Sequence, residues 1–290
     1  MAFNICIAII DRGNNFSGKL YQMPELPEVE TVRRQIQQGY LQARIVRVKT
    51  QPVRIFKNIT PAQFSRALEG KKILAVERVG KFMYWKVGKV YPAFHLGMSG
   101  IFISDRSLSL YPQHIHVSFY FQDGRTLHFQ DVRKFSKIFL FSAPPAFPEL
   151  GVDPLRENFT LNNFKKLLTS RKIAVKNLLM DQRMIAGIGN IYASEILFLS
   201  GIHPQRQCDT LKNSETGRLF RTIPKVLSSA IKHFGTTYTA YRTVQGEPGD
   251  NQNFLKVYQK AGEPCSGCRN LIQKSVLNSR STFYCPKCQR

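Results

Sequence analysis

The amino-acid sequence predicts an α+β protein of several domains: an antiparallel β-sandwich or barrel preceded by one helix, a mostly helical domain, and a small metal-binding β-hairpin. Short runs of alternating apolar residues separated by turn signals fill the first half of the chain, which is the pattern of antiparallel strands. After a proline-rich stretch over residues 144–154, the apolar residues recur with a helical period. Two Cys-x-x-Cys pairs close the chain.

The first half begins with one helix. It is expected over residues 27–40, where Val29, Val32 and Ile36 recur between charged residues. The alternating runs that follow predict strands, and residues 122–124 form a turn signal between two of them. The runs cover residues 45–48, 73–79, 82–87, 115–121, 126–129 and 138–141. Their spacing is typical of both sandwiches and barrels.

The second half is expected to be mainly helical. Apolar residues recur every three or four positions over residues 161–168, 174–180, 190–199 and 216–234. The polar segment 235–253 carries Gly246, Pro248 and Gly249, and we predict that it forms a long, mobile loop.

The charge of the chain indicates nucleic acid as a partner. Forty-two Lys and Arg residues against nineteen Asp and Glu residues give a formal net charge of +23, of the sign that DNA phosphates attract. A ribosome-associated protein, or one that binds anionic membrane surfaces, is the alternative. Hydrophobic residues make up 43% of the chain, which excludes general disorder. No apolar run approaches the roughly 18 residues of a membrane span, so we expect a soluble protein.

The cysteines predict a metal site. Each Cys-x-x-Cys pair can supply two thiolates to one tetrahedral Zn²⁺, and four sulfur ligands leave no open position, so the site should be structural. Between the pairs, residues 271–276 and 281–284 are expected to form a hairpin whose turn projects Asn278, Ser279 and Arg280. Such a hairpin either binds DNA or only stabilises the protein. The ligands are Cys265, Cys268, Cys285 and Cys288, and the remaining Cys6 and Cys208 are isolated, which favours a reducing, cytosolic compartment.

A glycine-rich turn precedes one predicted helix. The residues Gly187-Ile188-Gly189-Asn190 open the apolar pattern of residues 190–199. Glycines at this place let the amides of a helix N-terminus approach a phosphate, with Asn190 as a cap or donor. A plain packing corner between two helices is the alternative.

Three segments together resemble the formamidopyrimidine-DNA glycosylase family. They read MPELPEVETVR from Met23, GIGNIYASE from Gly187, and RSTFYCPKCQ from Arg280. The resemblance runs from Met23 to the C-terminus. It implies a β-sandwich catalytic domain over residues 24–150, a helix-two-turn-helix domain over residues 151–254 with a lesion-recognition loop at 235–253, and a zinc finger over residues 255–290. Residues 1–23 are then an extension that we expect to be absent from the mature protein.

The resemblance also implies an activity. The family's members are base excision repair enzymes that remove 8-oxoguanine and formamidopyrimidines from double-stranded DNA and cleave the strand by β,δ-elimination. It implies one structural Zn²⁺, a monomer, and a location in the bacterial cytoplasm, on the nucleoid when bound to DNA.

The implied catalytic residues are Pro24, Glu25, Lys81 and Arg280. In the family, an N-terminal proline attacks the anomeric carbon of the sugar and forms an iminium intermediate. An α-amine, with a pKa of about 8, is partly neutral near pH 7, whereas a lysine amine needs a large pKa shift. Glu25 corresponds to the residue that protonates the sugar ring oxygen, although it could also be only a helix N-terminal carboxylate; Glu28 and Glu30 are interpreted as mainly structural. Lys81 and Arg280 correspond to contacts to phosphates around the lesion.

Further DNA contacts follow from the resemblance. Met98, Arg133 and Phe135 match residues that fill the gap left by a flipped base and pair with the orphaned cytosine. Without the resemblance, Met98 and Phe135 would be interpreted as core residues. Phosphate contacts are also implied for His95, Lys176 and Asn190.

Two features depart from the family pattern. The family's DPRRFG segment here loses its proline and its last glycine at Val132 and Ser136, which puts the shape of this loop in doubt. The larger departure is the extension, because the nitrogen of Pro24 is not nucleophilic while it is part of a peptide bond. Met23 is itself a plausible initiator, and a misassigned start is our preferred interpretation over processing or an inactive variant.

Two rival functions remain at this stage. One is an endonuclease VIII-like glycosylase for oxidised pyrimidines, which shares the Pro-Glu start and the zinc hairpin. The other is a non-catalytic protein that binds damaged DNA and is kept in that state by its extension.

Overall fold

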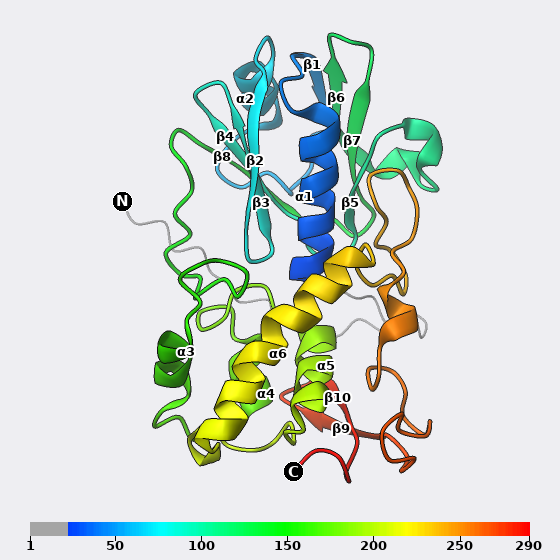
Figure 1. Cartoon of the computed structure of the whole chain (residues 1–290). Coiled ribbons are helices and arrows are strands. Elements are labelled where there is room, and N and C mark those ends of the chain that lie inside the picture. The colour runs from blue at the N-terminus through cyan, green and yellow to red at the C-terminus, as the bar shows by residue number, and fades with distance from the viewer. Residues whose placement is uncertain (1–22) are drawn as a thin grey trace.

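Two four-stranded antiparallel sheets face each other in the N-terminal half of the computed structural model, which describes residues 23–290 (Figure 1). One sheet has the order β1-β6-β7-β5 and the other β2-β3-β4-β8. The sheets meet at one corner, where Arg44 and Lys72 form an isolated bridge. The predicted sandwich is therefore confirmed over the barrel. The strands are β1 (Ile45–Thr50), β2 (Ile73–Val79), β3 (Phe82–Val87), β4 (Tyr91–His95), β5 (Gly100–Ile103), β6 (Ile115–Phe121), β7 (Thr126–Asp131) and β8 (Lys137–Phe141).

Aromatic side chains fill the space between the sheets. Trp85 is fully buried, and its ring lies 4.8 Å from that of Phe94 and 5.1 Å from that of Phe119, between centroids. The short helix α2 (Pro61–Leu68) adds Phe64 to this core, and its first turn is capped by the Thr60 hydroxyl. The sequence patterns did not predict α2, β4 or β5. Strands β4 and β5 are buried on both faces over most of their length, so they lack the alternation that reveals a half-exposed strand.

Helix α1 (Leu26–Tyr40) joins the two halves of the molecule. Its residues Val29, Val32 and Ile36 pack into the core of the sandwich, as the spacing predicts, whereas Leu26 belongs to the core of the helical half. Figure 1 shows α1 running along the sandwich, with its first turn next to the helices of the other half. The residues just before α1 therefore lie at the boundary between the two halves.

The helical half contains α3 (Leu161–Leu168), α4 (Val175–Met180), α5 (Asn190–Ser200) and α6 (Asn213–Lys232). All four predicted helices are confirmed. Helix α6 ends before Phe234, because Phe234 and Gly235 both have positive φ angles, of 57° and 79°. Among the described residues, no helix is both long and apolar enough to cross a membrane. Short 3₁₀ turns complete the chain at η1 (Arg106–Leu108), η2 (Pro112–His114), η3 (Cys208–Thr210) and η4 (Asn251–Phe254).

The segment 235–253 is irregular, as predicted, but it is firmly attached to the sandwich. Tyr241 and Val244 are buried in the sandwich core. The Val244 amide donates to Gln35 Oε1 of α1 at 2.9 Å, and the Val244 carbonyl accepts from the Ser104 amide at 2.8 Å. The predicted mobility does not agree with these contacts, since much of the segment is anchored across the boundary between the halves.

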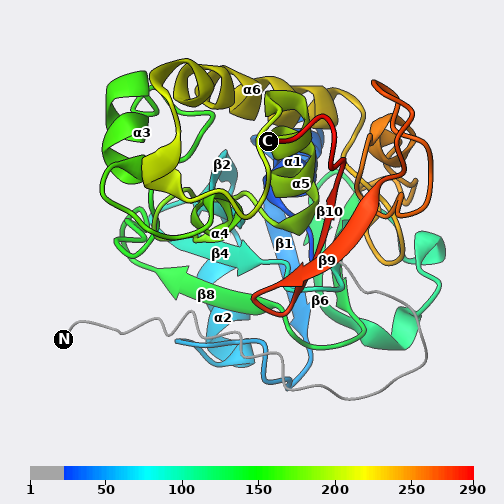
Figure 2. The same cartoon turned by 90° about the horizontal axis from the view of Figure 1, so that it is seen from below.

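A two-stranded hairpin follows, made of β9 (Gln273–Leu277) and β10 (Arg280–Tyr284). Its turn consists of Asn278 and Ser279, which both have positive φ angles, as in the two-residue turns that suit hairpins. Arg280, predicted to lie in the turn, is the first residue of β10. The figures place the hairpin beside α5, against which β10 packs (Figure 2).

A buried ion-pair network ties the sandwich to the segment that leads into the helical half. Arg78 of β2 is 3% exposed, and it donates to Asp153 Oδ2 at 2.6 Å and to Glu30 Oε2 of α1 at 3.0 Å. Asp153 also accepts from the Gly80 amide at 3.0 Å. The Arg78–Asp153 pair therefore fixes the turn between β2 and β3, and it also fixes the position of the sandwich relative to the segment that leads into the helical half.

Arg78→Ala should lower the free energy of unfolding by about 3–5 kcal/mol, because it leaves the buried carboxylate of Asp153 without its counter-charge and removes one of the three arginines that pair with Glu30. Chemical denaturation followed by circular dichroism measures this loss. Arg183→Ala is the control, since Arg183 pairs with Asp181 on the surface and its side chain is 69% exposed. Equal stability of the two variants would show that the buried network does not hold the halves together.

Candidate active site

The N-terminal ends of α1 and α5 meet beside a small cavity at the boundary of the two halves. Pro24 and Glu28 line this cavity from the α1 side, and Ile191, Thr236 and Tyr238 line it from the helical half. The site is thus built from segments more than 200 residues apart in the sequence. It brings Pro24, which the sequence analysis identified, next to the predicted lesion-recognition loop.

Glu25 lies on the N-terminus of α5. Its carboxylate accepts hydrogen bonds from the amides of Gly189 at 2.7 Å and Ile191 at 2.9 Å, with a longer bond from Tyr192 at 3.4 Å. Burial raises the pKa of Glu25, although the positive charge of Lys81 and these amides oppose the shift. The N-terminus of α5, which was predicted to bind a phosphate, is thus occupied by the carboxylate of Glu25.

The glycines of the Gly187-Ile188-Gly189 turn allow this contact. A Cβ atom on Gly189 would lie 2.4 Å from Cδ of Glu25, and one on Gly187 would lie 2.6 Å from a methyl carbon of Leu26. Gly187 also has a φ of 104°, which favours glycine. The turn is therefore a close packing corner between α5 and the start of α1, the alternative that the sequence had left open.

Glu28 connects Glu25 to the loop 235–253. Its carboxylate accepts from the Glu25 amide at 2.8 Å, from the Tyr192 hydroxyl at 2.5 Å and from the Thr236 amide at 2.7 Å. Burial and the neighbouring charge of Glu25 raise the pKa of Glu28 to about 7. The interpretation of Glu28 as mainly structural misses its place in the cavity wall. The only sequence signal was its position three residues after Glu25, where a capping residue stands.

Glu30 behaves differently from Glu28. It does not line the cavity, and its carboxylate pairs with Arg33, Arg34 and Arg78. These contacts agree with its interpretation as a structural residue.

Lys81 lies in the two-residue turn between β2 and β3. Burial lowers the pKa of its ammonium, Glu25 and Glu28 raise it, and Arg280 lowers it further. Glu25, Glu28 and Arg280 therefore lie within electrostatic range of Lys81. Three of the predicted catalytic residues, Glu25, Lys81 and Arg280, are thus brought together with Pro24 beside them.

His95, at the end of β4, is a buried neutral imidazole. Burial and the positive charges of Lys81 and Lys137 lower its pKa to about 3. Its Nδ1 accepts from the Gly97 amide at 3.1 Å, so the proton is assigned to Nε2. His95 can therefore donate one hydrogen bond at neutral pH.

Met98, Arg133 and Phe135 form one cluster at the end of the β5–β7 edge of the sandwich. The Arg133 Nη1 atom lies 3.4 Å from the Met98 sulfur, and the guanidinium carbon lies 4.7 Å from the centre of the Phe135 ring. Phe135 is 53% exposed, which is unusual for a core phenylalanine. The cluster supports the wedge interpretation over the core interpretation.

Lys176 and Asn190 both hold the backbone of β10. Lys176 Nζ donates to the Ser281 carbonyl at 3.1 Å and to Thr282 Oγ1 at 2.8 Å, and Asn190 Nδ2 donates to the Ser281 carbonyl at 3.0 Å. Lys176 is 1% exposed, and burial lowers its pKa to about 7. This differs from the phosphate contact expected of Lys176, because its ammonium is buried against the strand that begins with Arg280.

Tyr258, which was not among the residues predicted from the sequence, is buried beside Asn190. Burial raises its pKa, and so does the negative charge of Glu25, while Asn190 lowers it. Glu195 of α5 fixes this segment by accepting from the amides of Lys256, Val257 and Tyr258 at 2.8–2.9 Å. No periodicity or motif in the sequence marks Tyr258.

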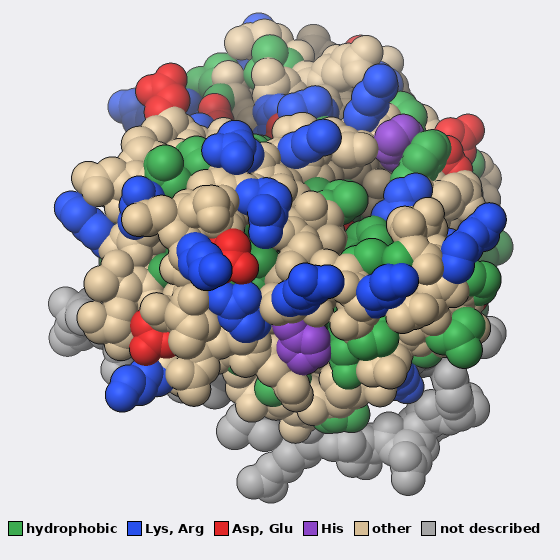
Figure 3. Space-filling view, turned by 60° about the horizontal axis from the view of Figure 1, so that its bottom comes forward, with side chains coloured by type: hydrophobic (Ala, Val, Ile, Leu, Met, Phe, Trp, Pro, Cys, Tyr) green, Lys and Arg blue, Asp and Glu red, His purple; other side chains and the backbone are tan. Residues whose placement is uncertain are grey.

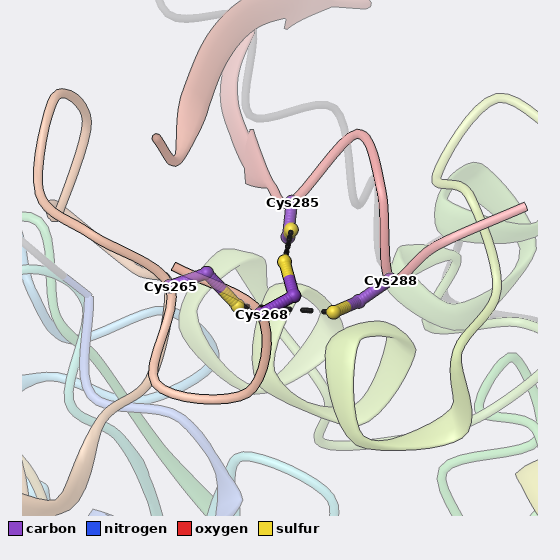
Figure 4. A group of neighbouring side chains, drawn as sticks. All are labelled: Cys265, Cys268, Cys285 and Cys288. Carbon is purple, nitrogen blue, oxygen red and sulfur yellow. Dashed lines mark hydrogen bonds between the residues drawn. The ribbon is translucent and has the colours of Figure 1, made fainter. Parts of the chain in front are cut away.

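The four predicted cysteine ligands converge next to the hairpin (Figure 4). Their sulfur atoms all lie within 4.8 Å of one another, with Sγ–Sγ distances of 3.8 Å for Cys265–Cys288 and 3.4 Å for Cys268–Cys285. A tetrahedral Zn²⁺ with bonds of about 2.3 Å places its sulfurs about 3.8 Å apart, so the donor set fits this metal. Cys208 is buried and separate from this cluster, and Cys6 lies outside the described residues.

On the face that Figure 3 shows, Lys and Arg side chains are spread widely, with few Asp and Glu side chains among them. This agrees with the composition of the sequence, which has 42 basic and 19 acidic residues. Such a surface attracts the phosphate backbone of nucleic acids.

Family models cover most of the chain. Residues 23–138 match the formamidopyrimidine-DNA glycosylase N-terminal domain, residues 150–242 match the formamidopyrimidine-DNA glycosylase H2TH domain, and residues 262–290 match the zinc finger found in FPG and IleRS.

Individual proteins are similar over nearly their full length. The formamidopyrimidine-DNA glycosylase of Symbiobacterium thermophilum is 39% identical, over 92% of this chain and 89% of the relative. A crystal structure of Lactococcus lactis Fpg with DNA containing an abasic site has a TM-score of 0.84 and 33% identity, covering 92% of this chain and 99% of that chain. A structure of MutM with DNA containing carbocyclic 8-oxo-G has a TM-score of 0.83 and 33% identity, covering 92% and 100%.

Gly189→Ala should destabilise the protein by about 1–3 kcal/mol, because the added methyl group meets the Glu25 carboxylate and pushes it off the N-terminus of α5. Thermal unfolding monitored by circular dichroism measures the change. Gly39→Ala in α1 is the control, since a Cβ there meets no atom within 4 Å. A variant as stable as the control would mean that Glu25 and α5 are not in close contact.

Proposed function

The chain belongs to the formamidopyrimidine-DNA glycosylase family, as its motifs predicted, and from this membership we propose that it excises oxidised purines from DNA and then cleaves the strand at the abasic site. Membership in the family supports the coarser function, that of a DNA repair glycosylase. The observation that carries the finer proposal is the place of Pro24 in the wall of the cavity between the two halves, next in the chain to Glu25, whose carboxyl group interacts electrostatically with Lys81.

Pro24 is proposed as the nucleophile once Met23 and the residues before it are removed. Its amine then carries a lone pair, which forms a bond to C1′ of the sugar while the bond from C1′ to the base breaks and its electrons leave with the base. The nitrogen then loses its proton, and the C1′–O4′ bond breaks with its electrons going to the ring oxygen, which is protonated. The nitrogen lone pair forms the C1′=N bond of an iminium ion, whose positive charge accepts electrons during elimination of the 3′ and then the 5′ phosphate. An α-amine suits this role, because its pKa of about 8 leaves part of it neutral near pH 7.

Glu25 is proposed as the acid that protonates the sugar ring oxygen as the ring opens. Burial raises its pKa, which favours the protonated form that this step requires. The carboxyl group also remains anchored on α5, so its position relative to Pro24 is fixed. Lys81 supplies a positive charge next to Glu25 and is proposed to contact the phosphate beside the lesion.

Arg280, Asn190 and His95 are proposed to bind the phosphates around the flipped nucleotide. The guanidinium of Arg280 offers a planar set of donors that matches a phosphate. Lys176 is proposed to support the phosphate contact of Arg280 indirectly, because its ammonium bonds to Ser281 and Thr282, the two residues of β10 that follow Arg280. Met98, Arg133 and Phe135 are proposed to fill the gap in the duplex.

One structural Zn²⁺ is proposed at Cys265, Cys268, Cys285 and Cys288. When bound, it links the two ends of the hairpin segment, and four thiolates leave no coordination site for a substrate. Its contribution is therefore to hold the hairpin that carries Arg280.

A chain that begins at Met23, with that methionine removed, should excise 8-oxoguanine and be trapped on the DNA by borohydride, which reduces the iminium at Pro24. The same chain with residues 1–22 retained should bind DNA without being trapped, because an amide nitrogen is not nucleophilic. In the shorter chain, Pro24→Gly should keep part of the trapping, since glycine offers a terminal amine, and Glu25→Gln should lose base excision. The measurement is gel separation of the covalent adduct.

Two outcomes would contradict this assignment. Efficient trapping of the intact, unprocessed chain would make another amine, such as that of Lys81, the nucleophile. Binding without trapping by both chains would instead leave a non-catalytic damage-binding protein. Comparing 8-oxoguanine with thymine glycol duplexes separates the purine enzyme from an endonuclease VIII-like one.

Cys285→Ser should lose the metal and with it most of the affinity for DNA, because the hairpin that carries Arg280 is no longer held. Metal analysis of the purified protein and a DNA titration at fixed salt measure the two effects. Cys208→Ser is the control and should keep both. Unchanged DNA affinity in a metal-free Cys285→Ser variant would show that the hairpin does not take part in binding.

A further inference from the structure

A single buried carboxylate connects the two loops that carry the wedge residues Met98, Arg133 and Phe135. Asp131, the last residue of β7, is completely buried. Its Oδ1 accepts from the Ser99 hydroxyl at 2.5 Å and from the Arg133 amide at 3.2 Å, and its Oδ2 accepts from the Ser136 amide at 2.8 Å. One side chain therefore bonds to residues adjacent to Met98 and Phe135 and to Arg133 itself.

Direct contacts between the loops complete this arrangement. Ser99 donates to Asp131 and at the same time accepts from the Arg133 amide at 3.0 Å. Gly97 has a φ of 61°, and a Cβ on it would lie 2.6 Å from the backbone carbon of Phe135. The loops are thus packed backbone against backbone, with the Asp131 carboxylate between them.

The wedge, formed by Met98, Arg133 and Phe135, needs such support because few other contacts of the fold hold its loops. Phe135 is largely exposed to water. The preceding Lys134 has a φ of 57°, in the left-handed region that residues other than glycine rarely adopt. The family's loop pattern has a proline and a glycine where this chain has Val132 and Ser136. Without the proline, backbone stiffness does not fix the loop, and the hydrogen bond from Ser136 to Asp131 takes a larger part in fixing it.

We propose that Asp131 is the positioning residue of the wedge, and that base extrusion, not bond breaking, depends on it. This inference rests on the proposed function. Among the described contacts, Asp131 makes none with Pro24, Glu25 or Lys81, so it acts through Met98, Arg133 and Phe135. Asparagine in its place presents an amide donor toward backbone donors, which breaks at least one of the three bonds.

The test uses the chain with a free Pro24 amine and compares two substrates. Asp131→Asn should slow single-turnover excision from an 8-oxoguanine duplex by about tenfold or more, as expected for the loss of hydrogen bonds to a buried charge. Borohydride trapping on a preformed abasic site should change by less than about twofold, because that site has little stacking to overcome. Ser99→Ala, a smaller change, should show the same selectivity with a smaller loss.

Asp123→Asn is the matched control. Asp123 lies in the β6–β7 turn, at the other end of the same strand, and also accepts a backbone bond, from the Arg125 amide at 3.1 Å. It should leave both reactions unchanged. Circular dichroism and metal content of each variant report whether the fold is intact.

A second readout separates this inference from the proposed function. 2-Aminopurine placed next to the lesion reports unstacking when the protein binds, whether or not chemistry follows. A smaller fluorescence rise with Asp131→Asn than with the parent chain supports the inference even if neither chain cleaves DNA. Equal losses on the duplex and the abasic site in a folded variant, or no loss with an unchanged fluorescence rise, would overturn it.

Discussion

The contact between the Glu25 carboxylate and the N-terminus of α5 is the constraint on which the site depends. It joins the first residues of the sandwich half to the helical half, and it is close enough that only glycine fits at position 189. Burying a carboxylate is costly, and the amides of Gly189 and Ile191 together with the charge of Lys81 offset that cost. Because Pro24 directly precedes Glu25, the same contact sets where the proposed nucleophile lies.

Other buried carboxylates in this basic protein act in the same way. Three of them accept hydrogen bonds from backbone amides, and two of these hold segments that carry a candidate DNA-contacting or catalytic residue. Asp153 holds the amide before Lys81, Asp131 holds the loop of Arg133, and Glu195 holds the segment that ends at Tyr258. These carboxylates direct their negative charge inward onto amides, in a chain with 42 basic and 19 acidic residues. The net positive charge that remains attracts phosphates.

The sequence predicted elements well where a single face is buried and poorly where contacts are long-range. The limits of β2 and β3 follow from alternation alone, whereas β5 is buried throughout and gives no such signal. Family motifs identified Pro24 and Lys81, but the burial of Lys176 under β10 and the bond from Glu28 to the Thr236 amide join residues over 100 positions apart. Neither periodicity nor motif spacing contains that information.

Under the proposed function, the exposed cations and the buried carboxylates have separate roles at one site. Arg280, which is partly exposed, is proposed to hold a phosphate, and salt weakens such an attraction. Buried groups such as Glu25 and Asp131 determine geometry, and salt reaches them far less because water is excluded around them. Under the proposed function, we therefore expect affinity for DNA and the accuracy of base extrusion to vary independently, although the residues proposed for them are neighbours on the same loops and helix ends.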